Sequence, residues 1–183
     1  MLLCFPTAMR SRKVTDSHWN LVWNKRPPEE ARNLNPAFCA ELISRTITEY
    51  YKARKAPMSL ATAFLILPLT LHGPTRKILP GRANTAFASW VATNNPLLAD
   101  LPGRVSRLRP VSREALLFSV RHCLNALADG GIIPGTKPIK LAVRPTPTTD
   151  DVNEARSASA LLGRWFATQP NEGTILQGFG IAP

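Results

Sequence analysis

The residue types that most often perform catalysis or bind metals are present in this sequence, but they are widely separated. No two histidines have the H-x-x-x-H spacing that places both imidazoles on one helix face; the three are His18, His72 and His122. No C-x-x-C pair occurs, so neither a cysteine zinc site nor a disulfide framework is predicted for Cys4, Cys39 and Cys123. We therefore expect no metal or other cofactor, and a reducing compartment.

Other candidate catalytic groups also lack the required geometry. Cys123 directly follows His122, and neighbours in a helix do not face each other, so we expect Cys123 to be a buried core thiol. Residues 73–77 lack the second glycine and the spacing of a phosphate-binding loop. The acidic pairs at residues 29–30 and 150–151 fit a proline-rich arm and a helix start. The sequence predicts a protein that is not an enzyme, with an unrecognised hydrolase as the minority alternative.

Positive charge is concentrated in the middle of the chain. Lys plus Arg is 23 against 12 Asp plus Glu, a formal net charge of +11 in 183 residues. Residues 101–145 hold eight cations and two carboxylates, and the candidates for contact with DNA or an acidic partner are Arg104, Arg107, Arg109, Arg113, Arg121, Lys137, Lys140 and Arg144. Such groups could neutralise phosphates without reading base sequence. The alternative is a solvated surface around a core.

The elements predicted to position these cations are a helix and a hairpin. A helix is expected from Ser112 to the turn at residues 129–131, with an apolar face formed by Leu116, Val120, Cys123, Leu124 and Leu127. Residues 132–133 and 139–143 are expected to pair as a hairpin with a basic tip. Because a hairpin follows a helix in winged-helix domains, we predict a mainly α-helical, winged-helix-like fold with a small β-hairpin.

Further helices are expected on both sides of this segment. Asn35 and Pro36 form a favourable helix start, and apolar residues recur at threes and fours to about Arg54. Residues 58–72 are apolar on all sides, so we expect a buried helix that Pro68 kinks or ends, with a buried strand as the alternative. A short helix at 85–93 and a restart of the chain at 94–96 into residues 97–108 are expected to follow.

The chain divides into three parts on this interpretation. An irregular N-terminal arm occupies residues 1–34, and a helical core ending in the basic helix and hairpin occupies residues 35–145. Residues 146–183 form a C-terminal helix, from about residue 150 to 168, and an apolar tail that packs on the core or on a partner. The longest apolar run is about 14 residues, below the ~20 that a membrane span needs. We expect a soluble, cytoplasmic protein without membrane contact.

Four segments resemble a known family. They are residues 26–39, 64–72, 112–118 and 161–166, and the similarity extends from about residue 19 to the closing Gly-Ile-Ala-Pro. In order and spacing they resemble the middle component of ABC-type three-component systems. The resemblance implies an adaptor encoded beside an SMC/Rad50-like ATPase and a variable effector, often a nuclease, in bacterial antiviral or anti-plasmid defence systems similar to Lamassu. It also agrees with winged-helix character.

Two functions therefore remain open. The first is a non-catalytic adaptor between the ATPase and the effector, with double-stranded DNA as a further candidate partner. The second is a stand-alone winged-helix DNA-binding regulator, which should be a symmetric dimer on a palindromic operator. Candidate partner-binding residues are Arg164, Trp165 and Phe179; Arg164 lies between Gly163 and Trp165 and is expected to make a bidentate carboxylate contact, within the fold or to a partner.

Overall fold

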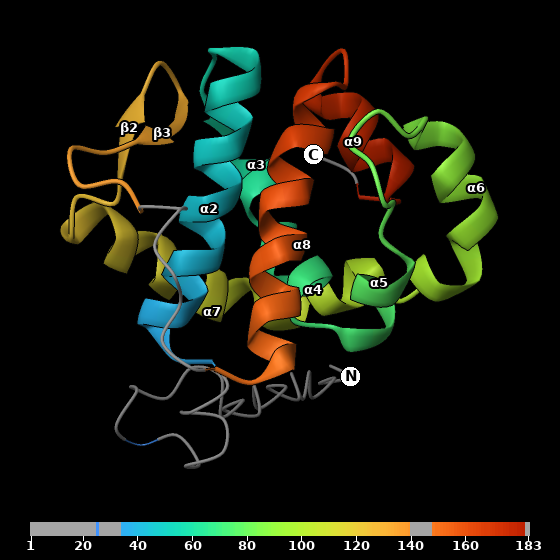
Figure 1. The fold of residues 1–183 in the computed structure, drawn as a ribbon, viewed down its shortest axis with the longest axis horizontal. Coiled ribbons are helices and arrows are strands. Elements are labelled where there is room, and N and C mark those ends of the chain that lie inside the picture. Colours follow the sequence, from blue (N-terminus) through green and yellow to red (C-terminus); the bar gives the residue numbers. More distant parts are fainter. Residues whose placement is uncertain (1–24, 26–33, 140–147, 182–183) are drawn as a thin grey trace, which may run out of the picture.

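The computed structural model describes residue 25, residues 34–139 and residues 148–181 (Figure 1). The predicted N-terminal arm lies almost entirely outside these residues. The helices are α2 (Pro36–Arg54), α3 (Leu60–Ala63), α4 (Ile66–Thr70), α5 (Gly73–Ile78), α6 (Phe87–Leu98), α7 (Leu101–Arg121), α8 (Asp150–Ala167) and α9 (Glu172–Gly178). The strands are β1 (Met58–Ser59), β2 (Asn125–Ala128) and β3 (Gly131–Pro134). The chain is mainly α-helical with a small antiparallel sheet, as predicted.

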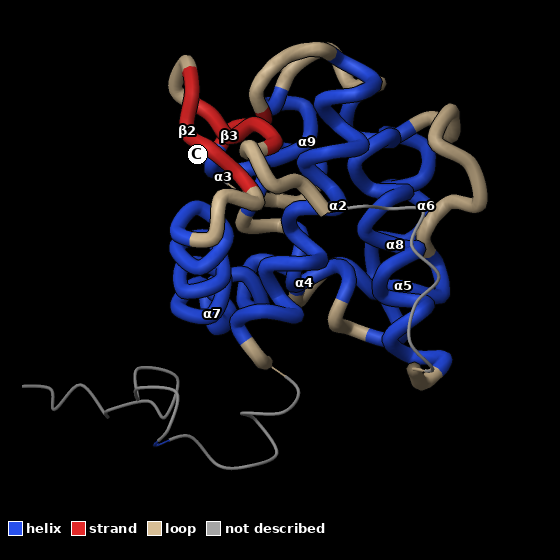
Figure 2. Tube along the Cα trace, turned by 60° about the vertical axis from the view of Figure 1, so that its left-hand side comes forward, coloured by secondary structure: helices blue, strands red, loops and turns tan. Residues whose placement is uncertain are grey.

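Helix α2 is the central element, and its start and end follow from local chemistry. The Asn35 side chain accepts a hydrogen bond from the Ala37 N–H at 2.8 Å, and Pro36 occupies the first turn, where a missing N–H costs nothing. Lys55 ends the helix in the left-handed conformation, with φ of 57°. The helix predicted from Asn35 to about Arg54 is therefore confirmed. Helices α7 and α8 pack on α2 from different sides (Figures 1 and 2).

The apolar interior forms two clusters. One surrounds α2 and joins it to α4, α7 and β3, and its fully buried members include Leu42, Ile47 and Leu67. The other joins the aromatic residues of α8 to α6 and α9. Ring contacts organise the second cluster, because Trp165 lies 4.9 Å from Trp90 at an interplanar angle of 84°, the edge-to-face arrangement that aromatic quadrupoles favour.

Helix α8 approaches α2 closely through a glycine. The helix predicted over residues 150–168 is confirmed, since α8 spans Asp150–Ala167. A Cβ at Gly163 would lie 2.9 Å from Glu49 Cβ and 3.0 Å from the Tyr50 nitrogen, and closer still to the Thr46 carbonyl oxygen. Gly163 therefore permits the close packing of α8 on α2. The Thr46 hydroxyl adds a hydrogen bond across the contact, donating to the Ser159 carbonyl at 2.9 Å.

The apolar segment after α2 is buried as predicted, but it is broken into three short elements. It begins as β1, and the Ser59 hydroxyl then caps α3 by accepting from the Thr62 N–H at 3.2 Å. Pro68 lies in the first turn of α4, where a backbone N–H has no helical partner to lose. The sequence predicts that Pro68 kinks or ends a helix. In the structure it does neither, because it lies in the first turn of α4.

Helix α7 differs from its prediction at both ends. It begins at Leu101 rather than at Ser112 and continues through Pro110. The carbonyl that Pro110 leaves without a donor belongs to the exposed Ser106, where water can hydrogen-bond to it. Helix α6 likewise runs through Pro96, so the predicted restart at residues 94–96 is wrong.

Local hydrogen bonding ends α7 earlier than the sequence predicts. Cys123 takes the left-handed conformation, with φ of 58°. The Leu124 N–H then bonds to the Ser119 carbonyl and the Cys123 N–H to the Val120 carbonyl, the pair of bonds of a Schellman motif. The helix thus stops at Arg121, about eight residues before the predicted turn at residues 129–131.

The hairpin consequently occurs one segment earlier than predicted. Strands β2 and β3 are joined by Asp129 and Gly130, which both have a positive φ. The tip of this hairpin is acidic because of the Asp129 side chain, so the predicted basic tip is wrong. Residues 140–143, predicted as the second strand, lie outside the described residues. The sheet order is β1-β3-β2, with Met58 opposite Ile132. The order of α7 followed by a hairpin remains compatible with a winged-helix arrangement.

Candidate interaction site

The outward face of α7 presents several of the predicted cations. Arg109, Arg113 and Arg121 are all exposed. They are four and eight residues apart in the sequence, so they lie in one row along the helix. Lys137 is also exposed, and its N–H bonds to the Cys123 carbonyl at 2.9 Å, which holds it beside the end of α7. Within the part of the chain that the structure describes, none of these four cations takes part in an ion pair.

Two of the remaining predicted cations, Arg104 and Arg107, are engaged in contacts within the fold. Arg104 is only 8% exposed, and its guanidinium donates to the Thr75 hydroxyl at 2.9 Å. Burial lowers the pKa of Arg104 below its ordinary value, in agreement with an internal position. Arg107 is exposed but paired with Asp100 at 2.6 Å. Lys140 and Arg144 lie outside the described residues.

Hydrophobic side chains share the outward face of α7 and the adjoining strand. Leu117 is 63% exposed, Val120 37% and Leu127 63%. Val120, Cys123 and Leu127 had been expected on a buried apolar face, and all three are exposed. The expectation failed because the helix ends at Arg121, so Cys123 and Leu127 no longer follow a helical period. Leu117 was not singled out from the sequence, although its spacing from Arg113 and Arg121 could have indicated its place.

Carboxylate and guanidinium groups bridge α2 and α8 on another face. Arg164 makes one contact, from its Nη1 to Glu49 Oε2 at 2.7 Å, so the predicted carboxylate contact exists within the fold but has a single hydrogen bond. The bidentate contact belongs to Arg156, which donates to both oxygens of Glu41 at 2.7 and 3.0 Å. Burial raises the pKa of Glu41, but hydrogen bonds from Arg156 and Arg45 outweigh it and hold this pKa below 4.5.

The other two candidate partner-binding residues are placed inside the fold. Trp165 is fully buried, and its indole N–H donates to the Thr85 carbonyl at 2.8 Å. Phe179 is 3% exposed and packs on Phe87, with ring centroids 5.2 Å apart. Neither side chain can contact a partner in this conformation. Their apolar character is explained by the second core cluster.

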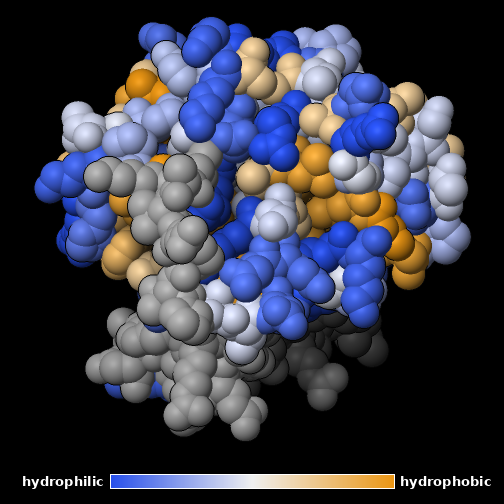
Figure 3. Space-filling view, viewed as in Figure 1, coloured by the Kyte–Doolittle hydropathy of each residue, from blue (hydrophilic) through white to orange (hydrophobic). Residues whose placement is uncertain are grey.

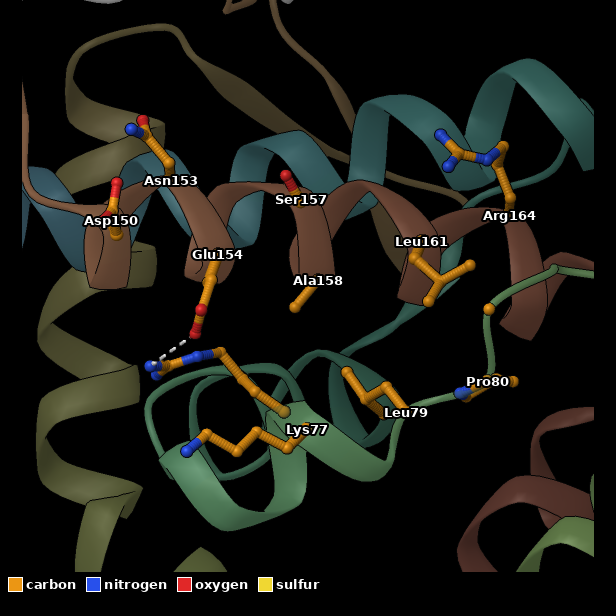
Figure 4. Close-up of a pocket in the computed structure, with 12 residues that line it drawn as sticks. Lys77, Leu79, Pro80, Asp150, Asn153, Glu154, Ser157, Ala158, Leu161 and Arg164 are labelled. Atoms are coloured by element: carbon orange, nitrogen blue, oxygen red, sulfur yellow. Dashed lines mark ion pairs between the residues drawn. The ribbon is translucent and has the colours of Figure 1, made fainter.

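A cavity of about 690 Å³ lies between α5 and α8. Figure 4 shows Leu79, Ala158 and Leu161 facing into it, whereas Arg164 projects outward at one end. The Arg76 guanidinium closes the other end through ion pairs to Asp151 and Glu154. In the space-filling view the apolar floor is visible as a hydrophobic patch between α8 and the loop that follows α5 (Figure 3). No sequence pattern predicts this cavity, because its walls come from segments that are distant along the chain.

Two further features bear on function. Nowhere in the described ranges do three or more His, Cys, Asp or Glu side chains gather as they would around a metal ion. Within the same ranges, no helix has the length and apolar character needed to cross a membrane.

Comparison with known proteins gives one match. No curated protein and no solved structure is detectably similar to the chain. Residues 23–183 match the family model described as "ABC-three component (ABC-3C) system Middle Component 3". This match covers nearly the whole chain and agrees with the motifs noted in the sequence. The chain therefore belongs to the family of middle components, type 3, of ABC-three component systems.

Proposed function

We propose that the protein is a non-catalytic adaptor that links an SMC/Rad50-like ATPase to an effector, nuclease-type subunit in a bacterial defence complex similar to Lamassu. It acts in the cytoplasm, and its partners perform the catalysis. Family membership supports this proposal, because a middle component of a three-component system has other subunits. The resemblance noted in the sequence is the basis for proposing that those subunits are an SMC/Rad50-like ATPase and an effector.

The observation on which the proposal chiefly depends is the presence of two unlike surfaces on one small chain. The outward face of α7 combines exposed hydrophobic residues with arginines that form no ion pair among the described residues. The cavity beside α8 has an apolar floor and charged ends. Helices α7 and α8, which carry these two surfaces, both pack on α2 (Figure 1). An adaptor needs separate surfaces for its two partners, and unlike chemistry at each would keep the partners from exchanging places.

Co-expression of the three components tests this proposal. We expect the chain to co-purify with both other subunits and to join them in one complex on size exclusion. Leu161→Glu places a charge in the apolar floor of the cavity, so it should release one subunit and retain the other. Leu97→Glu is the matched control, because Leu97 is exposed on α6 and lines neither surface. Failure of the unmodified chain to capture either subunit would contradict the adaptor role.

DNA contact is the second candidate function. The exposed Arg109, Arg113, Arg121 and Lys137, on a helix followed by a hairpin, favour it, since such groups could neutralise several phosphates. Gel-shift titrations with the complex at several salt concentrations test it. Arg113→Glu should weaken binding and flatten the dependence on salt if DNA lies on this face. A dimer that binds a palindromic operator without the other subunits would favour the regulator alternative.

A further inference from the structure

The outward face of α7 carries three arginines and a leucine in one regularly spaced row. Arg109, Arg113, Leu117 and Arg121 follow one another at four-residue intervals, which an α-helix places about 6 Å apart along its axis. Val120 extends the hydrophobic part beside Leu117 in the last turn. The row thus has two cations, a hydrophobic section and a further cation, over about 18 Å.

We propose that this face binds an acidic amphipathic helix of a protein partner, and not DNA. The inference rests on the proposed adaptor function and specifies the chemistry of one of its two partners. Carboxylates on the partner helix pair with Arg109 and Arg113 at one end and with Arg121 at the other. An apolar side chain between them packs on Leu117 and Val120.

The charges of the face require an acidic occupant. Its three arginines have no carboxylate partner within the described chain, and α7 contains one acidic residue, Glu114, which is only partly exposed. Guanidinium groups make paired hydrogen bonds to carboxylates, and Arg is the cation most enriched at protein interfaces. Both properties fit a row of exposed arginines that form no ion pair among the described residues.

The hydrophobic residues decide between a protein and a nucleic acid. Leu117 is 63% exposed and lies in the middle of the row, where a DNA backbone would leave it against phosphates and water. Binding to phosphate depends on cations and hydrogen-bond donors, and gains little from a leucine at its centre. A partner helix instead removes Leu117 and Val120 from water at the centre of the contact, where interface residues contribute most.

The inner face of α7 is fixed independently of this outer row. Val111, Ala115 and Leu116 are buried against the core around α2. Substitutions at Leu117 or Arg113 therefore change the outer face without opening the interior. A loss of binding in such variants reports on the contact and not on folding.

The test uses the purified chain against each of the two other subunits, and separately against a random-sequence DNA duplex, by biolayer interferometry. Leu117→Ser should weaken binding to one subunit by about tenfold, the loss expected when one largely exposed leucine is no longer buried on association. Arg113→Glu should weaken the same interaction by at least a similar factor. Leu97→Ser on α6, where Leu97 is 48% exposed, and Arg82→Glu in the exposed loop after α5 are matched controls and should bind as the unmodified chain does.

Each outcome distinguishes the inference from the function on which it rests. If Leu117→Ser binds both subunits as tightly as the unmodified chain, the α7 face is not the protein contact, although the adaptor role stands. If Arg113→Glu abolishes duplex binding and leaves subunit binding intact, the face belongs to DNA and the inference is overturned. If the unmodified chain binds neither subunit, the proposed function itself fails. Far-UV circular dichroism confirms that each variant is folded.

Discussion

Replacement of Gly163 by alanine is expected to destabilise the fold, although alanine is the better helix former. The position lies inside α8 and faces α2. In an isolated helix the change would stabilise by about 1 kcal/mol, because glycine loses more backbone entropy than alanine. The sign of the measured effect therefore reports on packing.

The packing cost follows from the position of the added methyl group. It would lie 2.9 Å from Glu49 Cβ and 3.0 Å from the Tyr50 nitrogen, where unstrained contacts are about 3.5–4.0 Å. The nearest obstacles include backbone atoms of α2, which cannot move away by changing a rotamer. Overpacking of this kind costs about 3 kcal/mol. After the helix-propensity gain, we expect a net loss of about 2 kcal/mol, or roughly 4–8 °C in Tm.

Urea denaturation followed by far-UV circular dichroism measures this difference. Gly81→Ala is the control, because a Cβ there would meet nothing within 4 Å. Its stability should match or slightly exceed that of the unmodified protein, by less than about 1 kcal/mol. A Gly163→Ala protein as stable as the control would refute the close approach of α8 to α2.

Three further predictions concern titration and the aromatic core. Burial, together with the nearby Arg104, lowers the pKa of His72, whose neutral Nδ1 accepts a hydrogen bond from the Thr75 N–H. The free energy of unfolding should therefore fall as the pH drops below 6.5, because the unfolded chain then binds a proton more readily than the folded one. Urea titrations at several pH values should show a smaller fall for His72→Asn. The pKa of Glu41 is held below 4.5, so its contribution is present above that pH and is lost on acidification below it; Glu41→Gln should lower stability at neutral pH and flatten the acid limb of the profile. Trp165→Ala should cost about 3–5 kcal/mol, because it empties the centre of the second core cluster, and thermal melts with near-UV circular dichroism would detect this loss.

Local signals in the sequence were sufficient for α2 and α8. Asn35 and Pro36 specify the start of α2 by capping chemistry, and the acidic residues 150–151 suit the start of α8. Gly163 in the interior of the predicted helix also indicates a packing reason, because glycine is a poor helix former. These predictions depend on residues near one another in the chain.

The end of α7 could not be predicted in the same way. Its stop uses Cys123 in a left-handed conformation, whereas sequence rules look for glycine or asparagine at that position. A helix extended to residue 129 places Leu127 on the buried apolar face, whereas Leu127 in β2 is 63% exposed. Tertiary packing also keeps α6 and α7 helical through Pro96 and Pro110, against the local preference of proline.

Part of the candidate site was accessible from charge alone. The cluster of cations between residues 101 and 145 correctly identified α7 as basic, with Arg109, Arg113 and Arg121 on its exposed face. Burial of Arg104, however, depends on Thr75, which is 29 residues away in the chain. The cavity between α5 and α8 has the same origin in distant segments, and no sequence pattern marks it.

The pairing of β3 between β1 and β2 has a consequence for recognition. Because Met58 is fully buried and pairs with Ile132, the hairpin is tied along one edge to the segment that leaves α2. It cannot swing as a free flap at the end of α7. A ligand that docks there meets a surface whose shape is set in advance, so little conformational entropy is lost on association and recognition should be closer to lock-and-key than to folding upon binding.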